Sequence, residues 1–249
     1  MTTLLEARGV WKAFDERSVL RGIDVEVKQH DVVALIGASG SGKSTLLRCI
    51  NGLDAVDAGT ILLDPHSDRP VDVTAVRADL DAVRRRVGIV FQSYNLFPHM
   101  TVLDNITLAQ RKVLRRSTDE ARVTAMTLLD RFGLADKAQD YPDRLSGGQS
   151  QRAAIVRALA MEPQLVLFDE ITSALDPLLV GEVLDAVREL TREGLTIVMA
   201  THEIGFAREV ADQVCFLHGG VVHEAGPPGQ VLVDPQQPLT QEFLARVLG

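Results

Sequence analysis

The sequence predicts an α/β fold with a mainly parallel sheet, because short apolar runs alternate with amphipathic segments along most of the chain. Three runs are apolar throughout: Val32–Ile36, residues 165–168 and Thr196–Ala200. Strands of this kind are covered on both faces, as in a parallel sheet with right-handed helical crossovers. Further strands are expected at residues 4–8, 60–63, 87–91, 213–217 and 221–224.

Composition limits the classes of protein that fit. A chain of 249 residues, 46% of them hydrophobic, is long enough for one large globular domain with an insertion. The net charge of −8 argues against a nucleic-acid-binding protein. No apolar run reaches the length of a membrane span and the first residues do not resemble a signal peptide, so we expect a cytoplasmic protein. Cys49 and Cys215 lie in apolar contexts and are expected to be core thiols rather than a disulfide.

The strand pattern disappears in the middle of the chain. Helical patterns cover residues 102–109, 118–132 and 147–160 instead. We therefore expect one domain, 1–249, with a helical subdomain inserted at approximately 94–161. A short extension at approximately 219–249 is rich in Pro and Gly and is expected to end in an amphipathic helix at 241–247.

A glycine-rich segment follows the first apolar strand and opens a helix at 43–51. It fits the pattern G-x-x-x-x-G-K-[ST], in which backbone N–H groups and a helix N-terminus hold phosphate oxygens. Lys43 is expected to reach the β- and γ-phosphates, Ser44 to hold Mg²⁺, and Thr45 to contact the α-phosphate. The alternative is a glycine-rich turn with a surface lysine. The expected nucleotide-binding residues are Gly37, Ala38, Ser39, Gly40, Ser41, Gly42, Lys43, Ser44 and Thr45.

Two acids end the apolar strand at 165–168, where ligands bind in open α/β sheets. Asp169 is the candidate for the magnesium shell, and Glu170 is placed to orient and polarise an attacking water as general base. The alternative is an acidic loop at the edge of a sheet without a chemical role. The presence of a phosphate loop in the same sequence favours the metal and base roles over it.

Three single residues are further candidates for the nucleotide site because of their positions in the predicted fold. Gln92 follows the strand at 87–91, where its amide can contact both Mg²⁺ and the water, and His202 follows the strand Thr196–Ala200 as a candidate γ-phosphate sensor. Phe14 offers an aromatic face for adenine. The alternatives are a solvated loop glutamine, a structural histidine and simple packing of the N-terminal strands.

The segment 145–149 has the sequence Leu-Ser-Gly-Gly-Gln. Ser146 is expected to cap a helix, while Gly147 and Gly148 expose N–H groups and Gln149 lies in the first turn. This second anion-binding helix start lies on the inserted subdomain, away from the phosphate loop of the same chain. A second copy of the chain could supply it in trans; an ordinary capped helix is the alternative.

Taken together, these motifs resemble the ATP-binding subunits of ABC transporters over nearly the whole chain. Residues 37–45 resemble the Walker A motif, 145–149 the signature and 165–170 Walker B. Gln92, residues 173–176, His202 and Phe14 match the Q-, D-, H- and A-loops. The resemblance implies a P-loop NTPase core with an N-terminal antiparallel β region, and an ATPase that uses ATP and Mg²⁺.

The resemblance also implies partners. These are a second copy bound head to tail, integral membrane permease subunits and, indirectly, a solute-binding protein, with the chain peripheral on the inner face of the membrane and no nucleic acid bound. Residues 46–51, 95–102 and 201–207 resemble the polar amino-acid importers. Compatible-solute, opine or export systems remain alternatives. Soluble chromosome-maintenance or DNA-repair ATPases fit less well, because 52 residues separate Gln92 from Leu145 without a heptad run.

The chain departs from the family pattern at a few positions. Ile171 stands where Pro usually follows the glutamate, so we expect a softer loop there. Ser150, Ala38 and the pair His30-Asp31 replace the usual Gln, Pro and Gly-Glu. None of these changes removes a group that is expected to touch phosphate.

Overall fold

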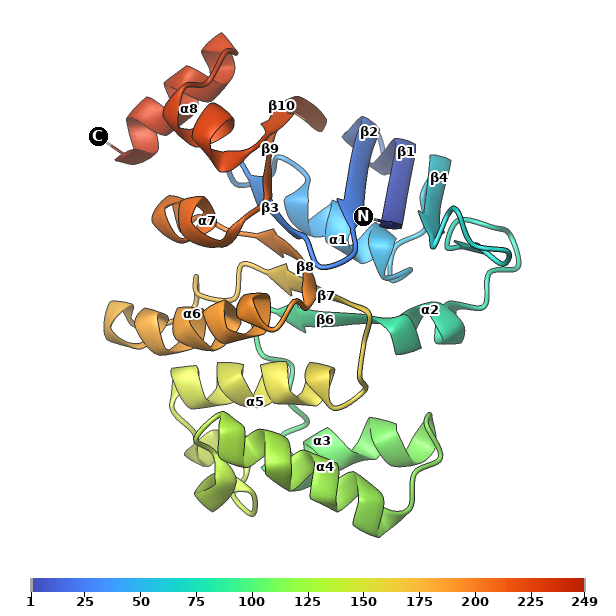
Figure 1. Cartoon of the computed structure of the whole chain (residues 1–249), viewed down its shortest axis with the longest axis vertical. Helices are drawn as coiled ribbons and strands as arrows, with labels where there is room; N and C mark the ends of the chain where they lie inside the picture. Colours follow the sequence, from blue (N-terminus) through green and yellow to red (C-terminus); the bar gives the residue numbers. More distant parts are fainter. Residues whose placement is uncertain (1, 249) are drawn as a thin grey trace.

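The computed structural model describes residues 2–248, which form two β-sheets with helices between and around them (Figure 1). The larger sheet has the strand order β10-β9-β3-β8-β7-β6, with β10 antiparallel to β9 and the other neighbours parallel. This confirms the predicted class. The strands are β3 (Val32–Ile36), β6 (Val87–Phe91), β7 (Leu165–Asp169), β8 (Thr196–Ala200), β9 (Gln213–His218) and β10 (Val221–Gly226).

Both faces of this sheet are buried, which explains the continuous apolar runs. In β3, Val33 and Leu35 face one hydrophobic core, whereas Val32, Ala34 and Ile36 face the other. The same alternation runs through β7 and β8. Each Val, Leu or Ile that is fully buried in this way contributes about 1.5–3 kcal/mol relative to exposure, so the sheet is a rigid platform for the loops that follow its strands.

The smaller sheet is antiparallel, with the order β2-β1-β4-β5. Its strands are β1 (Thr3–Phe14), β2 (Arg17–Lys28), β4 (Ala58–Leu63) and β5 (Val71–Asp72). The sequence prediction was too short at β1 and missed β2 and β5. The signal for β2 was present as strict alternation: Ile23, Val25 and Val27 are buried, and the residues that follow each of them are exposed.

Helix α1 (Lys43–Ile50) lies between the two sheets and packs against β2, β7 and β8. Helix α4 begins at Thr118, where the sequence predicts a helix to start, and Ser117 caps it in a capping box with Glu120. The other helices are α2 (Leu80–Arg86), α3 (Val102–Lys112), α4 (Thr118–Arg131), α5 (Gly147–Leu159), α6 (Pro177–Arg192), α7 (Ile204–Val210) and α8 (Pro238–Leu248).

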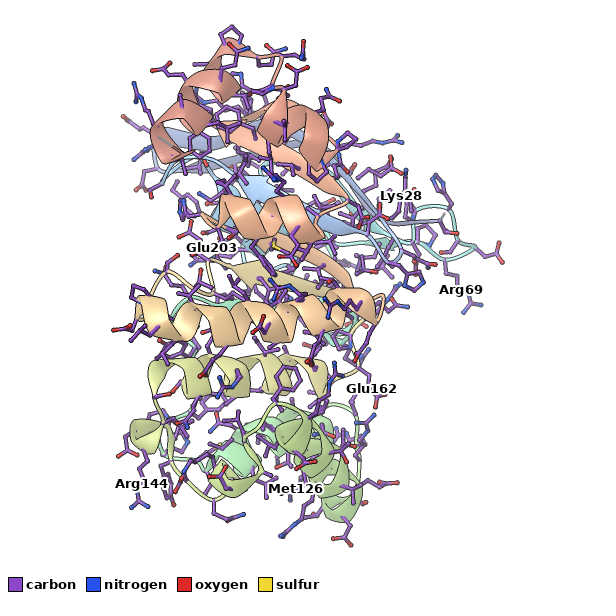
Figure 2. The ribbon with its side chains drawn as sticks, turned by 60° about the vertical axis from the view of Figure 1, so that its left-hand side comes forward. Lys28, Arg69, Met126, Arg144, Glu162 and Glu203 are labelled. Atoms are coloured by element: carbon purple, nitrogen blue, oxygen red, sulfur yellow. The ribbon has the colours of Figure 1, made fainter. Side chains whose placement is uncertain are left out.

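Helices α3, α4 and α5 occupy one end of the long axis in Figure 1, and Met126 and Arg144 mark that end in Figure 2. Residues 94–161 contain these helices, two short 3-10 turns and no strand. At the other end, α8 covers the β9–β10 hairpin, where the rings of Phe216 and Phe243 lie 5.1 Å apart. Among residues 2–248, no helix combines the length and apolarity needed to cross a bilayer.

Candidate nucleotide-binding site

The parallel register brings four of the predicted segments to one edge of the large sheet. Asp169 at the end of β7 is level with Phe91 of β6 and Ala200 of β8, and Ala200 is level with Leu35 of β3. Gly37, Gln92, Glu170 and His202 therefore all follow strands at the same edge, although they are far apart in the sequence. This edge is where ligands bind in open α/β sheets.

The phosphate loop needs glycine at two positions. Gly37 has φ 144°, and a Cβ there would lie 2.1 Å from the carbonyl oxygen of Leu217. Gly42 has φ 109°, and its Cβ would lie 2.8 Å from Leu20. Gly42 is the N-cap of α1 without a side-chain cap, so the first N–H groups of the helix are left for an anion. Ala38, Ser39 and Gly40 are exposed at the crest of the loop, whereas Ser41 is buried.

Lys43 lies at the centre of a chain of charged contacts. Its side chain is buried, and Nζ donates to the carbonyl oxygens of Gly37 (2.9 Å) and Ala38 (3.3 Å). The same Nζ lies 3.2 Å from Oε1 of Glu170, which is 3.0 Å from Nε2 of His202. Three predicted residues from three loops are thus in direct contact. Glu170, the candidate base, therefore contacts Lys43, the lysine that is expected to bind phosphate.

The backbone of Glu170 is in the left-handed region, with φ 48°, and its N–H donates to the carbonyl oxygen of Ala200 at 3.0 Å. A non-glycine residue in this region costs about 1–2 kcal/mol. Such conformations gather at functional sites, where the surrounding structure holds them in place. Here the bond to Ala200 fixes the turn that points the carboxylate toward Lys43.

Ser44 and Asp169 form the second pair in the site, since Ser44 Oγ donates to Asp169 Oδ1 at 2.6 Å. Burial raises the pKa of Asp169, while the hydrogen bond from Ser44 acts in the opposite direction. A hydroxyl and a carboxylate are ligands that Mg²⁺ accepts together with phosphate oxygens and water. The two side chains are therefore a fitting donor set for this ion.

An open cleft of about 340 Å³ lies between the phosphate loop and the β1–β2 hairpin. Phe14 lines it and is 44% exposed, so part of its surface is open to the cleft. Arg17 and Val19 also line the cleft. These two residues lie on β2, a strand that was not predicted from the sequence. The remaining lining residues are Gly40, Gly42, Lys43, Ser44, Thr45 and Glu170.

Two predicted parts of the site lie outside this cleft. Gln92 is exposed in the turn after β6 and is not among the residues that line the cleft. The segment 145–149 is likewise absent from the lining. Ser146 caps α5 as predicted: its Oγ accepts from the N–H of Gln149 at 3.2 Å, and its own N–H donates to Gln149 Oε1 at 2.9 Å.

The surroundings of the two glycines show where this segment lies. A Cβ on Gly147 would meet the hydroxyl of Tyr94 at 3.1 Å and Leu175 at 3.2 Å, and one on Gly148 would meet Leu179 at 3.4 Å. The segment therefore packs beside the loop before α6 and the start of that helix. The structure does not bring the segment to the phosphate loop of the same chain.

Comparisons with known proteins agree with this geometry. The family model described as ABC transporter matches residues 20–173. The glutamine transport ATP-binding protein GlnQ of Geobacillus stearothermophilus is 49% identical over 96% of both chains. The L-cystine import ATP-binding protein TcyC of Bacillus subtilis is 48% identical over 99% of both.

Among solved structures, the ATP-binding cassette MJ0796 in a dimeric post-hydrolysis state with ADP and Pi has a TM-score of 0.80 and 32% identity. The match covers 90% of this chain and 99% of that one. A phosphate loop, two acids and a histidine at one sheet edge accompany a family match over more than half of the chain. The chain therefore belongs to the ABC transporter family, as one of its ATP-binding, ATP-hydrolysing subunits.

Proposed function

We propose that this chain is the ATPase subunit of an importer for polar amino acids. The observation that carries the proposal is the agreement among its relatives, which are named for the transport of glutamine, cystine, arginine and glutamate. Each of these four is 47–49% identical to this chain over 96% or more of its length. The contacts among Lys43, Glu170 and His202 support the chemistry that such a subunit performs.

In the proposed site, Phe14 stacks on adenine and the loop 37–45 holds the phosphates, with Lys43 on the β- and γ-phosphates. Glu170 acts as general base on the attacking water, and His202 contacts the γ-phosphate. The 3.0 Å contact between His202 and Glu170 supports these roles, because one phosphate-sized group can reach both side chains.

Ser44 and Asp169 would hold Mg²⁺, with Gln92 from the neighbouring loop as a third protein ligand. When bound, the ion neutralises charge on the β- and γ-phosphates. Asp169 would have to exchange its bond with Ser44 for the ion, and its buried carboxylate favours a cation that replaces lost hydration. Ser44 would offer its hydroxyl oxygen to the same ion.

A second copy would complete each site with Ser146, Gly147, Gly148 and Gln149. Their position beside Leu175, outside the cleft of their own chain, supports this sharing. Ser146 is exposed at the start of α5, whereas Gly148 is buried, so in the proposed pair the side chain of Ser146 would meet the nucleotide of the second copy first. Dimeric cassettes among the solved relatives are consistent with a head-to-tail pair.

Closure of the pair would reach the permease through residues 92–105. An apolar groove of about 480 Å³ lies beside this segment, between the end of α1, β6, α3 and α5. Phe97, Leu108 and Met161 line it. We propose that a helix of the permease binds there, on a subdomain formed by residues 94–161. The chain would then lie in the cytoplasm on the inner face of the membrane, and a solute-binding protein would deliver the amino acid.

Uptake into vesicles tests this proposal. The chain is purified with its permease partner and reconstituted with ATP on the cytoplasmic side. The solute-binding protein and radiolabelled glutamine, arginine, cystine or glycine betaine are added on the opposite side. We expect ATP-dependent accumulation of at least one polar amino acid and none of the betaine. Accumulation of betaine alone, or export of the label, would contradict the proposal and leave the ATPase assignment intact.

A further inference from the structure

Two side chains outside the predicted site, Lys12 and Asp57, hold the tip of the β1–β2 hairpin beside the nucleotide cleft. Lys12 Nζ lies 3.2 Å from Asp57 Oδ1, and Asp57 Oδ2 accepts the backbone N–H of Ala13 at 2.5 Å. The bond from Ala13 and the contact with Lys12 lower the pKa of Asp57. The carboxylate is therefore charged at neutral pH and fastens both a side chain and the backbone of the hairpin.

Lys12 also lies against the ring that is expected to receive the base. Its Nζ is 5.1 Å from the centroid of Phe14, within the range of a cation–π contact. Phe14 lines the cleft, whereas Lys12 is not among the lining residues. The side chain of Lys12 is 14% exposed, much less than the ring. The ammonium group thus covers one side of the ring and leaves the ring open toward the cleft.

The place of Asp57 in the fold connects the two ends of the site. It immediately precedes β4, at the end of the loop that follows α1, and its N–H donates to the carbonyl oxygen of Trp11 at 2.9 Å. The first turn of α1 carries Lys43 and Ser44. Asp57 therefore ties the hairpin that presents Phe14 to the segment that continues from the phosphate-binding helix.

We propose that Lys12 and Asp57 are positioning residues for the nucleotide base: the ion pair fixes the Phe14 ring before ATP arrives. The proposal rests on the stacking role proposed for Phe14. A ring that is already ordered loses less conformational freedom when the base stacks on it, so ATP binds more tightly. Neither residue lines the cleft beside the phosphate loop, so we expect the effect of the pair to be confined to the base.

Binding constants of the full-length chain measured in EDTA, where turnover is blocked, test the proposal. Lys12→Met and Asp57→Asn are each expected to raise the Kd for ATP about fivefold, which corresponds to about 1 kcal/mol. The Kd for inorganic tripolyphosphate, which has no base, should stay unchanged. Lys12→Arg should restore ATP binding, because a guanidinium can keep both contacts. Lys28→Met, at an exposed lysine at the far end of β2 (Figure 2), is the matched control.

A double-mutant cycle with Phe14→Leu separates a positioning role from a structural one. If Lys12 acts through the ring, Lys12→Met should have no further effect on ATP binding in the Phe14→Leu background. Equal weakening of ATP and tripolyphosphate binding, or additive effects, would overturn the proposal. A loss with Phe14→Leu but none with Lys12→Met would overturn the positioning role alone. Unchanged binding with Phe14→Leu would overturn the stacking role as well, whereas amino-acid import is judged separately by uptake.

Discussion

Replacing Glu170 by Gln should slow hydrolysis and at the same time tighten the binding of ATP. Lys43 Nζ lies 3.2 Å from Oε1 of Glu170, so a phosphate group of ATP must compete with a carboxylate for the same ammonium group. Gln keeps a neutral acceptor but removes the charge. Hydrogen bonds to charged groups contribute about 1.5–3 kcal/mol and neutral ones about 0.5–1.5 kcal/mol. The contact between Lys43 and residue 170 should therefore weaken by about 1 kcal/mol, which lowers the Kd for ATP about fivefold.

Three measurements on one variant check this reasoning. Titration with ATP in EDTA gives the Kd without turnover, and thermal unfolding of the empty chain should show a Tm about 2–4 °C lower than that of the wild type. With Mg²⁺ and the permease present, turnover should fall about 10²- to 10⁴-fold. Glu193→Gln, at an exposed ion pair with Arg131, is the control. ATP binding that is no tighter than in the wild type would refute the competition, and wild-type turnover would refute the role of Glu170 as base.

Three further outcomes are expected. Gly37→Ala should destabilise the chain by at least about 2 kcal/mol, because a Cβ would lie 2.1 Å from a backbone oxygen at φ 144°; urea unfolding measures this. Gly205→Ala, in helix α7 with open space around it, should leave stability equal or slightly higher, and equal losses at both glycines would contradict the steric reasoning. Ser44→Ala should weaken Mg²⁺-dependent ATP hydrolysis, because the hydroxyl is needed to bind the ion. The Kd for ATP in EDTA should stay within about twofold of the wild type. An equal loss of ATP binding with and without Mg²⁺ would count against that role. Burial raises the pKa values of Cys49 and Cys215 to about 12, so almost no thiolate exists at pH 8. A maleimide should therefore label neither thiol until the chain is unfolded. Rapid labelling of the folded chain would disprove the burial of these thiols.

The sheet edge that carries the site could be predicted from the sequence. Apolar strands such as Val32–Ile36 and Thr196–Ala200 gave a signal because both of their faces are buried in cores. Parallel strands place their carboxyl ends together, so polar residues directly after them had to gather. This is why Lys43, Glu170 and His202, drawn from three separate segments, were found without knowledge of the fold.

Other elements gave a weaker signal. Strand β2 buries one face only, and its alternation of Ile23 and Val25 with acids was overlooked. Arg17, the first residue of this strand, was missed with it. Helix α2 buries only Val83, so it shows no apolar stripe. The contact between Lys43 and Glu170 depends on the left-handed backbone conformation of Glu170. Such a conformation at a glutamate could not be predicted from the local sequence.

Mixing two inactive variants tests the shared active site most directly. A Ser146→Arg chain keeps Lys43 and Glu170 but loses its capped helix start, whereas a Glu170→Gln chain keeps that helix start and loses the base. In a head-to-tail pair made of one of each, one site joins both functional halves and the other joins neither. We expect the mixture, assembled with the permease, to recover about a quarter of wild-type ATP turnover if pairs form at random and the two sites act independently. Turnover no greater than that of the separate variants would contradict a site shared between two copies.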